Sequence, residues 1–126
     1  MGHHTKVFGS TKIWAPWNLE MEPYACISTE VEVLNVAPVS MGEHSTVSQF
    51  SYLCEATHDF DDPSMPVVSG PIRIGRGAWV CADVFVGPNV MVGDNAVVSA
   101  RATVFEDVPA NMIAAGNPAK PIRKRD

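Results

Sequence analysis

Residues 74–108 repeat a pattern of apolar and polar positions with a period of six. An aliphatic residue opens each hexad: Ile74, Val80, Val86, Val92, Val98 and Val104. Four places later stands a small or β-branched residue: Ala78, Val84, Val90, Ala96, Ala102 and Val108. An α-helix needs a period of 3.6, and the turn-forming residues Gly, Pro, Asn and Asp recur inside the hexads. The pattern therefore predicts a parallel β-helix, in which two residues of each hexad point inward and stacked coils share one aliphatic column.

A looser form of the same register precedes residue 74. Ile27 and Val33 begin it, and Met41, Val47 and Leu53 continue it with Ser45, Ser51 and Thr57 at the small positions. The register resumes at Val68, three residues later than two further hexads would require. The sequence therefore predicts coils over residues 27–57 and 68–109, with a protruding loop over residues 58–67.

The two ends of the chain lack the hexads. Residues 1–26 carry Trp14, Trp17 and two prolines, which indicates an irregular cap over the open first coil. Residues 110–126 leave the register and end in a basic tail, which indicates a short extended segment that folds back. We expect one all-β domain over residues 1–126.

Charge and cysteine content narrow the classes of function. A net charge of −5 argues against nucleic-acid binding, although Lys120, Arg123, Lys124 and Arg125 make the last residues basic. Three cysteines without a CxxC pair favour reduced thiols and a cytoplasmic location. The sequence has no apolar run long enough for a membrane span, and "MGHHTKVF" lacks the apolar core of a signal peptide.

Three stretches resemble the hexapeptide-repeat acyltransferases. They are "NVAPVSMGEH", "SQFSYLCEATHDFDDP" and the hexads from "PIRIGRGAW" through "GNPAKPIRKR". The resemblance covers residues 27–125. It is nearest to the colanic-acid type of O-acetyltransferase and more distant to the maltose and galactoside O-acetyltransferases. It implies a left-handed β-helix, whereas parallel crossovers in general are right-handed in ~98% of cases.

The resemblance also implies a reaction and a set of site residues. The donor would be acetyl-CoA, the acceptor a small hydroxylated molecule, and no metal is expected. The enzyme would be a homotrimer with each active site between two subunits. The general base would be His58, and the coenzyme-binding positions would be Trp79, Ala82, Ala100, Asn117, Lys120 and Arg123. Thr57 stands where the family usually has Asn, and Phe105 and Glu106 stand where it has a Thr-Lys pair, so Glu106 opposes binding of a polyanion.

The chemistry of acetyl transfer needs few groups. A base must take the hydroxyl proton and hydrogen-bond donors must stabilise the oxyanion. Histidine is largely neutral at pH 7 and suits the first task. A carboxylate or carbonyl must orient its ring, and Asp59, Asp61 and Asp62 lie in the same loop. His58 could equally be an ordinary loop histidine, and Trp79 could face a neighbouring subunit instead of the coenzyme.

Two other functions fit a chain of this fold. A trimeric scaffold or binding module with a degenerate coenzyme site would explain Glu106. A γ-type carbonic anhydrase would need three histidines around zinc, but only His44 and His58 lie outside the N-terminus.

Overall fold

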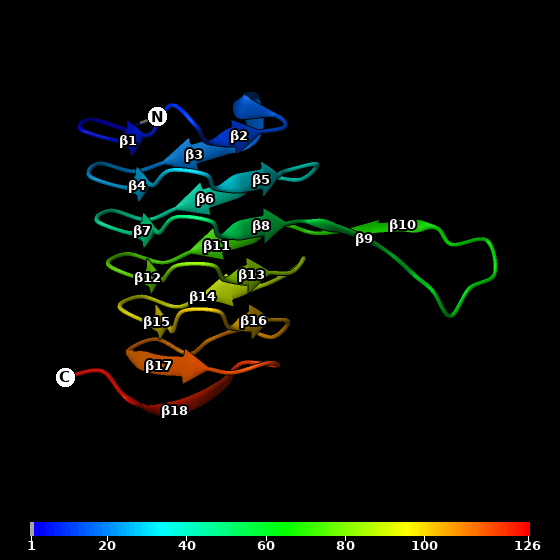
Figure 1. Cartoon of the computed structure of the whole chain (residues 1–126). Helices are drawn as coiled ribbons and strands as arrows, with labels where there is room; N and C mark the ends of the chain where they lie inside the picture. The colour runs from blue at the N-terminus through cyan, green and yellow to red at the C-terminus, as the bar shows by residue number, and fades with distance from the viewer. Residues whose placement is uncertain (1) are drawn as a thin grey trace.

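The chain winds into a stack of coils from which one arm projects (Figure 1). The computed structural model describes residues 2–126. Each coil passes in turn through three sheets, and we name two of the corners between them. The groove corner joins the first and second sheets, at residues 48–51, 81–84 and 99–102. The arm corner joins the second and third sheets, at residues 35–38, 55–71 and 87–90.

Short strands form the three faces of the stack. The first sheet contains β1 (Lys6–Val7), β4 (Cys26–Ile27), β7 (Thr46–Val47), β12 (Trp79–Val80), β15 (Val97–Val98), β17 (Met112–Ala115) and β18 (Lys120–Lys124). The second contains β2 (Lys12–Ile13), β5 (Glu32–Leu34), β8 (Tyr52–Cys54), β13 (Phe85–Val86) and β16 (Thr103–Val104). The third contains β3 (Leu19–Met21), β6 (Val39–Met41), β11 (Ile72–Ile74) and β14 (Met91–Val92).

The hexads lie in the core as predicted. All twelve residues at the two inward positions of residues 74–108 are at most 4% exposed. Parallel pairing places equal positions above one another, as with Val80 and Val98 or Val86 and Val104. The fold is therefore the parallel β-helix that the six-residue period indicates.

The corners explain why turn-forming residues recur. Many corner residues have positive φ, among them Asp83 at 57°, Asn89 at 59° and Asn95 at 58°. Asn, Asp and Gly adopt this left-handed conformation at lower cost than other residues. The residue types at the corners are thus selected by backbone geometry, while the inward side chains of the strands form the core.

The N-terminal region differs from the irregular cap expected at residues 1–26. Its strands β1, β2 and β3 pair in parallel with β4, β5 and β6, so they form a first coil of the stack. Eight residues separate Ile13 from Met21, instead of the six that separate Val86 from Val92. A 3₁₀ turn, η1 (Pro16–Asn18), fills the longer corner and exposes Trp17. Because of these two additional residues, a fixed spacing of six does not detect this coil.

The arm is longer than the predicted loop over residues 58–67. Its base is an antiparallel hairpin of β9 (Ala56–His58) and β10 (Val67–Ser69). Thr57 and Val68, both expected inside coils, are exposed because they pair with each other across this hairpin. The coil instead ends at the buried Glu55 and resumes at the buried Ile72.

The C-terminal extension closes the opposite end. Strand β17 continues the first sheet in parallel with β15, and β18 then turns back antiparallel to β17. This return brings the basic residues of β18 to the last coil. Nowhere in residues 2–126 does a helix reach the length and apolarity needed to cross a membrane.

Candidate functional site

The backbone of the arm orients His58. Its Nδ1 lies 2.7 Å from the carbonyl oxygen of Met65, on the opposite side of the hairpin. A carbonyl oxygen can only accept, so Nδ1 carries the proton and Nε2 of the neutral ring has a free lone pair. The imidazole is exposed, and Nε2 is therefore available as a base toward a molecule outside the arm.

The aspartates of the arm organise its tip instead of orienting the histidine. Asp59 Oδ1 accepts the Asp61 N–H at 3.1 Å. Asp62 Oδ1 accepts the N–H and the hydroxyl of Ser64, both at 2.9 Å, and these bonds hold the pKa of Asp62 below its usual value. The sequence offered these carboxylates as partners of His58, whereas the structure assigns that role to the Met65 carbonyl.

A buried carboxylate at the base of the arm was not found by sequence reasoning. Glu55 is fully buried, and its two oxygens accept the backbone N–H groups of Ala37 at 3.0 Å and Ile72 at 2.9 Å. Burial raises the pKa of Glu55 to about 7, against the two hydrogen bonds, which lower it. The available signal was its place two residues after Leu53, where the preceding coil has Asn35.

Three of the expected coenzyme-binding residues lie at or beside the groove corner. Ala82 and Ala100 line one shallow hollow of about 350 Å³, together with Gln49, Phe50, Asp83 and Arg101. Trp79 precedes this corner on β12, is 46% exposed, and donates its indole N–H to Ser48 Oγ at 2.8 Å. The outward direction expected for Trp79 is thus confirmed.

The turn at residues 116–119 extends the same corner toward the C-terminus. Thr103 N–H donates to the Gly116 carbonyl at 3.1 Å, and the Thr103 carbonyl accepts from Ala119 N–H at 2.8 Å. The Thr103 hydroxyl also donates to the side-chain oxygen of Asn117. Asn117 is therefore held against β16, the strand that directly follows the groove corner.

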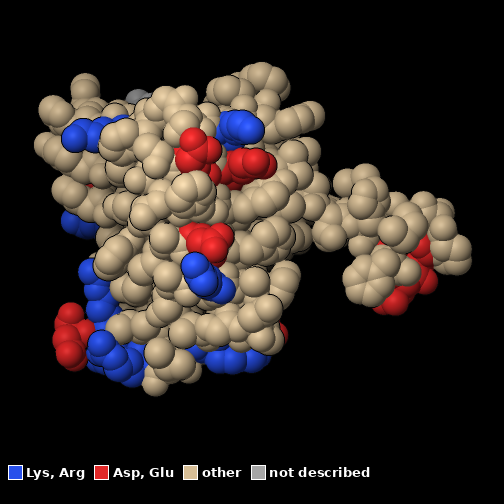
Figure 2. All heavy atoms as spheres, in the orientation of Figure 1, with Lys and Arg blue, Asp and Glu red and all other residues tan. Residues whose placement is uncertain are grey.

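Strand β18 supplies positive charge beside this turn. Lys120 Nζ lies 3.6 Å from Glu106, and Arg123 lies 3.9 Å from Asp126, all on exposed side chains. Figure 2 shows Lys and Arg gathered at the C-terminal end of the stack, while acidic side chains cover the tip of the arm. The charge of Glu106 is thus partly balanced by Lys120.

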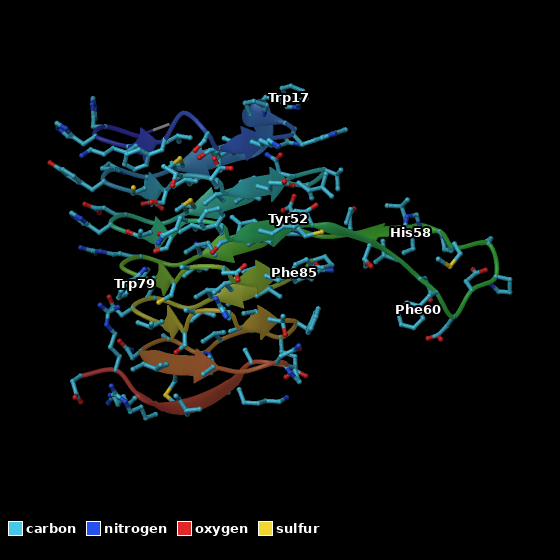
Figure 3. All side chains as sticks on the ribbon, in the orientation of Figure 1. Trp17, Tyr52, His58, Phe60, Trp79 and Phe85 are labelled. Atoms are coloured by element: carbon cyan, nitrogen blue, oxygen red, sulfur yellow. The ribbon has the colours of Figure 1, made fainter. Side chains whose placement is uncertain are left out.

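The structure separates the expected base from the expected coenzyme positions. Trp79 and His58 lie on opposite sides of the molecule in Figure 3, because the arm leaves from a different corner than the hollow. Ala82 and Ala100 line the hollow at the groove corner, and Asn117 is bonded to Thr103 directly after that corner, whereas His58 lies out on the arm. A single chain does not bring these groups into one cavity.

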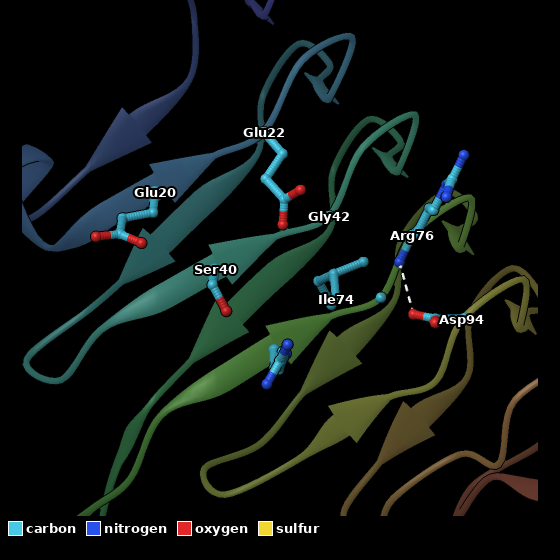
Figure 4. A pocket seen from close by; sticks show the side chains of 9 residues that line it. Glu20, Glu22, Ser40, Gly42, Ile74, Arg76 and Asp94 are labelled. Atoms are coloured by element: carbon cyan, nitrogen blue, oxygen red, sulfur yellow. Dashed lines mark hydrogen bonds between the residues drawn. The ribbon is translucent and has the colours of Figure 1, made fainter. Parts of the chain in front are cut away.

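A further hollow, of about 460 Å³, lies on the outer face of the third sheet (Figure 4). Gly42 and Gly75 line it and lie tightly against the backbone of Arg76 and Asp94 in the following coils. Charged side chains surround it: Glu20, Glu22, Arg73, Arg76 and Asp94. The seven expected site residues are not among its lining residues. Within residues 2–126, no three His, Cys, Asp or Glu side chains are placed to share a metal ion.

Comparison with known proteins identifies relatives over the whole chain. Residues 71–106 match the bacterial transferase hexapeptide family, as six repeats. A putative colanic acid biosynthesis acetyltransferase of Escherichia coli (strain K12) is 40% identical over 125 residues, which are 99% of this chain and 69% of that protein. The galactoside O-acetyltransferase of Escherichia coli (strain K12) is 43% identical over 56 residues, which are 44% of this chain and 28% of that protein.

Solved structures share the fold at lower sequence identity. A hexapeptide-repeat acetyltransferase of Vibrio cholerae, solved with acetyl-CoA, superposes with a TM-score of 0.93 at 24% identity, over 100% of this chain and 70% of that one. A maltose O-acetyltransferase of Clostridium difficile superposes with a TM-score of 0.92 at 23% identity, over 100% and 69% of the two chains. At these identities the likeness concerns the fold.

Proposed function

The chain belongs to the hexapeptide-repeat acetyltransferase family, and from that membership we propose that it moves an acetyl group from acetyl-CoA to a hydroxyl of a sugar or similar small molecule. The observation that carries the proposal is the state of His58. Its Nδ1–H is held by the Met65 carbonyl, which leaves Nε2 unprotonated and exposed. That is the form a general base requires.

The groove corner suits the donor. Ala82 and Ala100 have small side chains, so the narrow acyl-pantetheine chain of the donor can approach the backbone between consecutive coils. The basic strand β18 lies at the end of the same edge, where it can attract phosphate groups. Trp79 adds an exposed apolar surface beside the hollow. This distribution fits a molecule that is narrow and apolar at one end and anionic at the other.

The proposed chemistry requires one proton carrier. His58 Nε2 takes the proton of the acceptor hydroxyl as that oxygen attacks the thioester carbonyl. The C–S bond then breaks, and His58 returns the proton to the departing thiolate, so that the products are an acetyl ester and a free thiol. Backbone N–H groups at the coil corners are available to stabilise the oxyanion.

Because His58 and the groove corner are far apart on one chain, a complete active site requires a second subunit. We propose a homotrimer in which the arm of one subunit extends over the groove corner of its neighbour. The support is that residues 57–69 of the arm are exposed on their own chain and project away from it (Figure 1). Cys26, Cys54 and Cys81 are unpaired thiols, which suits work in a reducing compartment such as the cytoplasm.

The test is His58→Ala, assayed by thiol release from acetyl-CoA with a panel of sugars and other hydroxylated acceptors. We expect kcat to fall by about 10²–10⁴, the loss typical of a missing general base, while the Kd for acetyl-CoA and the oligomer mass stay the same. His44→Ala is the matched control, because His44 is an exposed corner residue that stacks on Tyr24. Full activity in His58→Ala would eliminate the general-base role.

A second function, a non-catalytic scaffold, is favoured only by Glu106. Its carboxylate opposes a polyanion, although Lys120 lies 3.6 Å away. Calorimetry with acetyl-CoA separates the two functions: an acetyltransferase saturates with the coenzyme, and a scaffold with a degenerate site gives no heat at millimolar concentration.

A further inference from the structure

The arm meets its own coil at one place, the arm corner. Its hairpin is closed by backbone bonds within the arm, from Asp59 N–H to the Pro66 carbonyl and from Gly70 N–H to the Glu55 carbonyl. Residues 57–69 are exposed and extend away from the stack. The direction in which the arm points is therefore decided at residues 55 and 70–72.

The side chain of Glu55 joins three segments at that place. Glu55 lies at the outgoing end of the arm, and its carboxylate accepts Ile72 N–H at the returning end and Ala37 N–H from the preceding coil. Ile72 N–H also lies 3.3 Å from the Pro38 carbonyl, a longer bond than the one of 2.9 Å that it donates to Glu55. The carboxylate thus fixes the two ends of the arm to each other and to the rigid stack.

We propose that Glu55 is a positioning residue for acetyl transfer, whose ionised carboxylate sets the angle of the arm and so the position of His58. This inference rests on the proposed function of His58. A carboxylate is required because both partners are donors, and only a carboxylate offers two acceptor oxygens and no proton. Protonation replaces one acceptor by a donor that faces a backbone N–H, so one of the two attachments is lost.

The energetic balance argues that this charge serves function. Burial raises the pKa of Glu55 to about 7, so the ionised form is disfavoured by the fold although it makes both hydrogen bonds. A group that costs stability in its working form is typical of functional sites, since folding alone does not select it. The arm should accordingly be fixed above pH 7 and loosened below it.

The surroundings give this ionisation to Glu55 alone. The corner segments packed around it, residues 35–38, 70–72 and 87–90, contain no titratable side chain. The ionisable side chains on the adjoining strands are Tyr52 and Cys54 on β8, Glu32 on β5 and Arg73 on β11, all at outward positions. His58 lies on the exposed arm, beyond these segments.

The first experiment needs no enzymatic activity. Backbone amide shifts of Ala37 and Ile72 are followed by NMR from pH 5.5 to 8.5 in the unmodified protein. We expect both to titrate together near pH 7, and in Glu55→Gln neither to titrate. In that variant the protection of the Gly70 and Ile72 amides against hydrogen exchange should fall at least tenfold, while that of Val86 in the core is unchanged. Absence of a joint titration, or unchanged protection, would overturn the proposal.

The second experiment measures catalysis. Glu55→Gln keeps the size of the side chain but accepts only one N–H, so we expect kcat at pH 8 to fall about tenfold with the KM for acetyl-CoA within twofold. In a plot of log kcat against pH, the slope on the acidic side should correspond to two protons in the wild type and to one proton in the variant. Glu55→Asp, which keeps the charge on a shorter chain, should recover part of kcat, and the exposed Glu32→Gln should match the wild type.

The two proposals fail in different ways. A wild type that titrates at Ala37 and Ile72 but transfers no acetyl group contradicts the proposed function, and the catalytic role of Glu55 falls with it. An active wild type whose Glu55→Gln variant keeps kcat and the same slope on the acidic side contradicts the positioning role alone.

Discussion

The amide of Asn35 offers the sharpest test of how the coils are held at the arm corner. Its side chain accepts the Ala15 N–H at 2.8 Å and donates to the Ala15 carbonyl at 2.6 Å, and both residues are fully buried. Asn35→Ala removes both bonds and leaves the buried Ala15 N–H without a partner, whereas the Ala15 carbonyl keeps its bond from Asn18 N–H at 2.9 Å. The unpaired donor costs about 1–3 kcal/mol and the lost bond to the carbonyl about 0.5–1.5 kcal/mol, so we expect the free energy of unfolding to fall by about 1.5–4.5 kcal/mol.

A second substitution at the same position separates hydrogen bonding from lost volume. Asn35→Asp keeps the acceptor for Ala15 N–H but sets a carboxylate against the Ala15 carbonyl. Its proton can restore the missing donor, so the folded state raises the pKa of the new carboxyl above its ordinary value near ~3.9. The native state then binds the proton more tightly, and stability relative to wild type is lost as pH rises from about 4. The loss in Asn35→Ala should not change with pH.

The assay is urea denaturation followed by tryptophan fluorescence, with Trp14 adjacent to Ala15 as a local probe. All variants are compared at one protein concentration, because the stability of an oligomer depends on it. The exposed Thr29→Ala serves as the control and should stay within ~0.5 kcal/mol of wild type. An Asn35→Ala variant as stable as that control would refute the assignment of two essential hydrogen bonds to this amide.

Three further outcomes are expected. Because the pKa of Glu55 is raised to about 7 from its ordinary 4.5, the native state binds its proton more tightly between these values. The free energy of unfolding should therefore decline from pH 4.5 to 7 relative to Glu55→Gln, and equal slopes in urea titrations would contradict this. Glu106→Gln releases Lys120 and should lower the Kd for acetyl-CoA about two- to fivefold at low salt by calorimetry, with the gain lost at high salt. Leu53→Ala opens a cavity in the middle of the stack and should cost about 2–5 kcal/mol in urea denaturation, and a smaller loss would mean that the coils collapse around it.

The period of six predicts the core because it reports burial directly. Every residue from Ile74 to Val108 at the two inward places is buried. The same pattern fails at the arm for a physical reason. Thr57 and Val68 have the size and polarity of inward residues, yet they pair with each other in a hairpin that never enters the stack. Apolar spacing does not distinguish a strand that pairs in a coil from one that pairs across an arm.

The candidate site shows a similar division. His58 and Trp79 are side chains with recognisable chemistry, and a resemblance was enough to select them. The group that orients His58 is the carbonyl of Met65, and a backbone acceptor leaves no mark in the sequence. Glu55 was passed over because a charged residue is expected outside. Its buried position follows from partners that only the folded corner brings together.

The arm corner explains how a rigid repeat accommodates an insertion. Pairing between β2, β5 and β8 places Ala15, Asn35 and Glu55 above one another, all fully buried. The chemistry of Asn35 and Glu55 matches the backbone groups that lie beside each side chain. Asn35 lies beside one donor and one acceptor of Ala15, and its amide forms a hydrogen bond with each. Glu55 lies beside two donors, and its carboxylate accepts a hydrogen bond from each.

The following coil shows a corner without an insertion. Val86 leads to Val92 in six residues, and the corner between them holds Gly87 and Pro88 and needs no polar side chain inside. Where fifteen residues are added between Leu53 and Ile74, the side chain of Glu55 bridges the two ends of the addition, beside the longer backbone bond from Ile72 N–H to the Pro38 carbonyl. The interruption that carries His58 outward and the carboxylate that anchors it are therefore one structural event. A chain that lost Glu55 would retain its repeat and its histidine, but not the fixed relation between them.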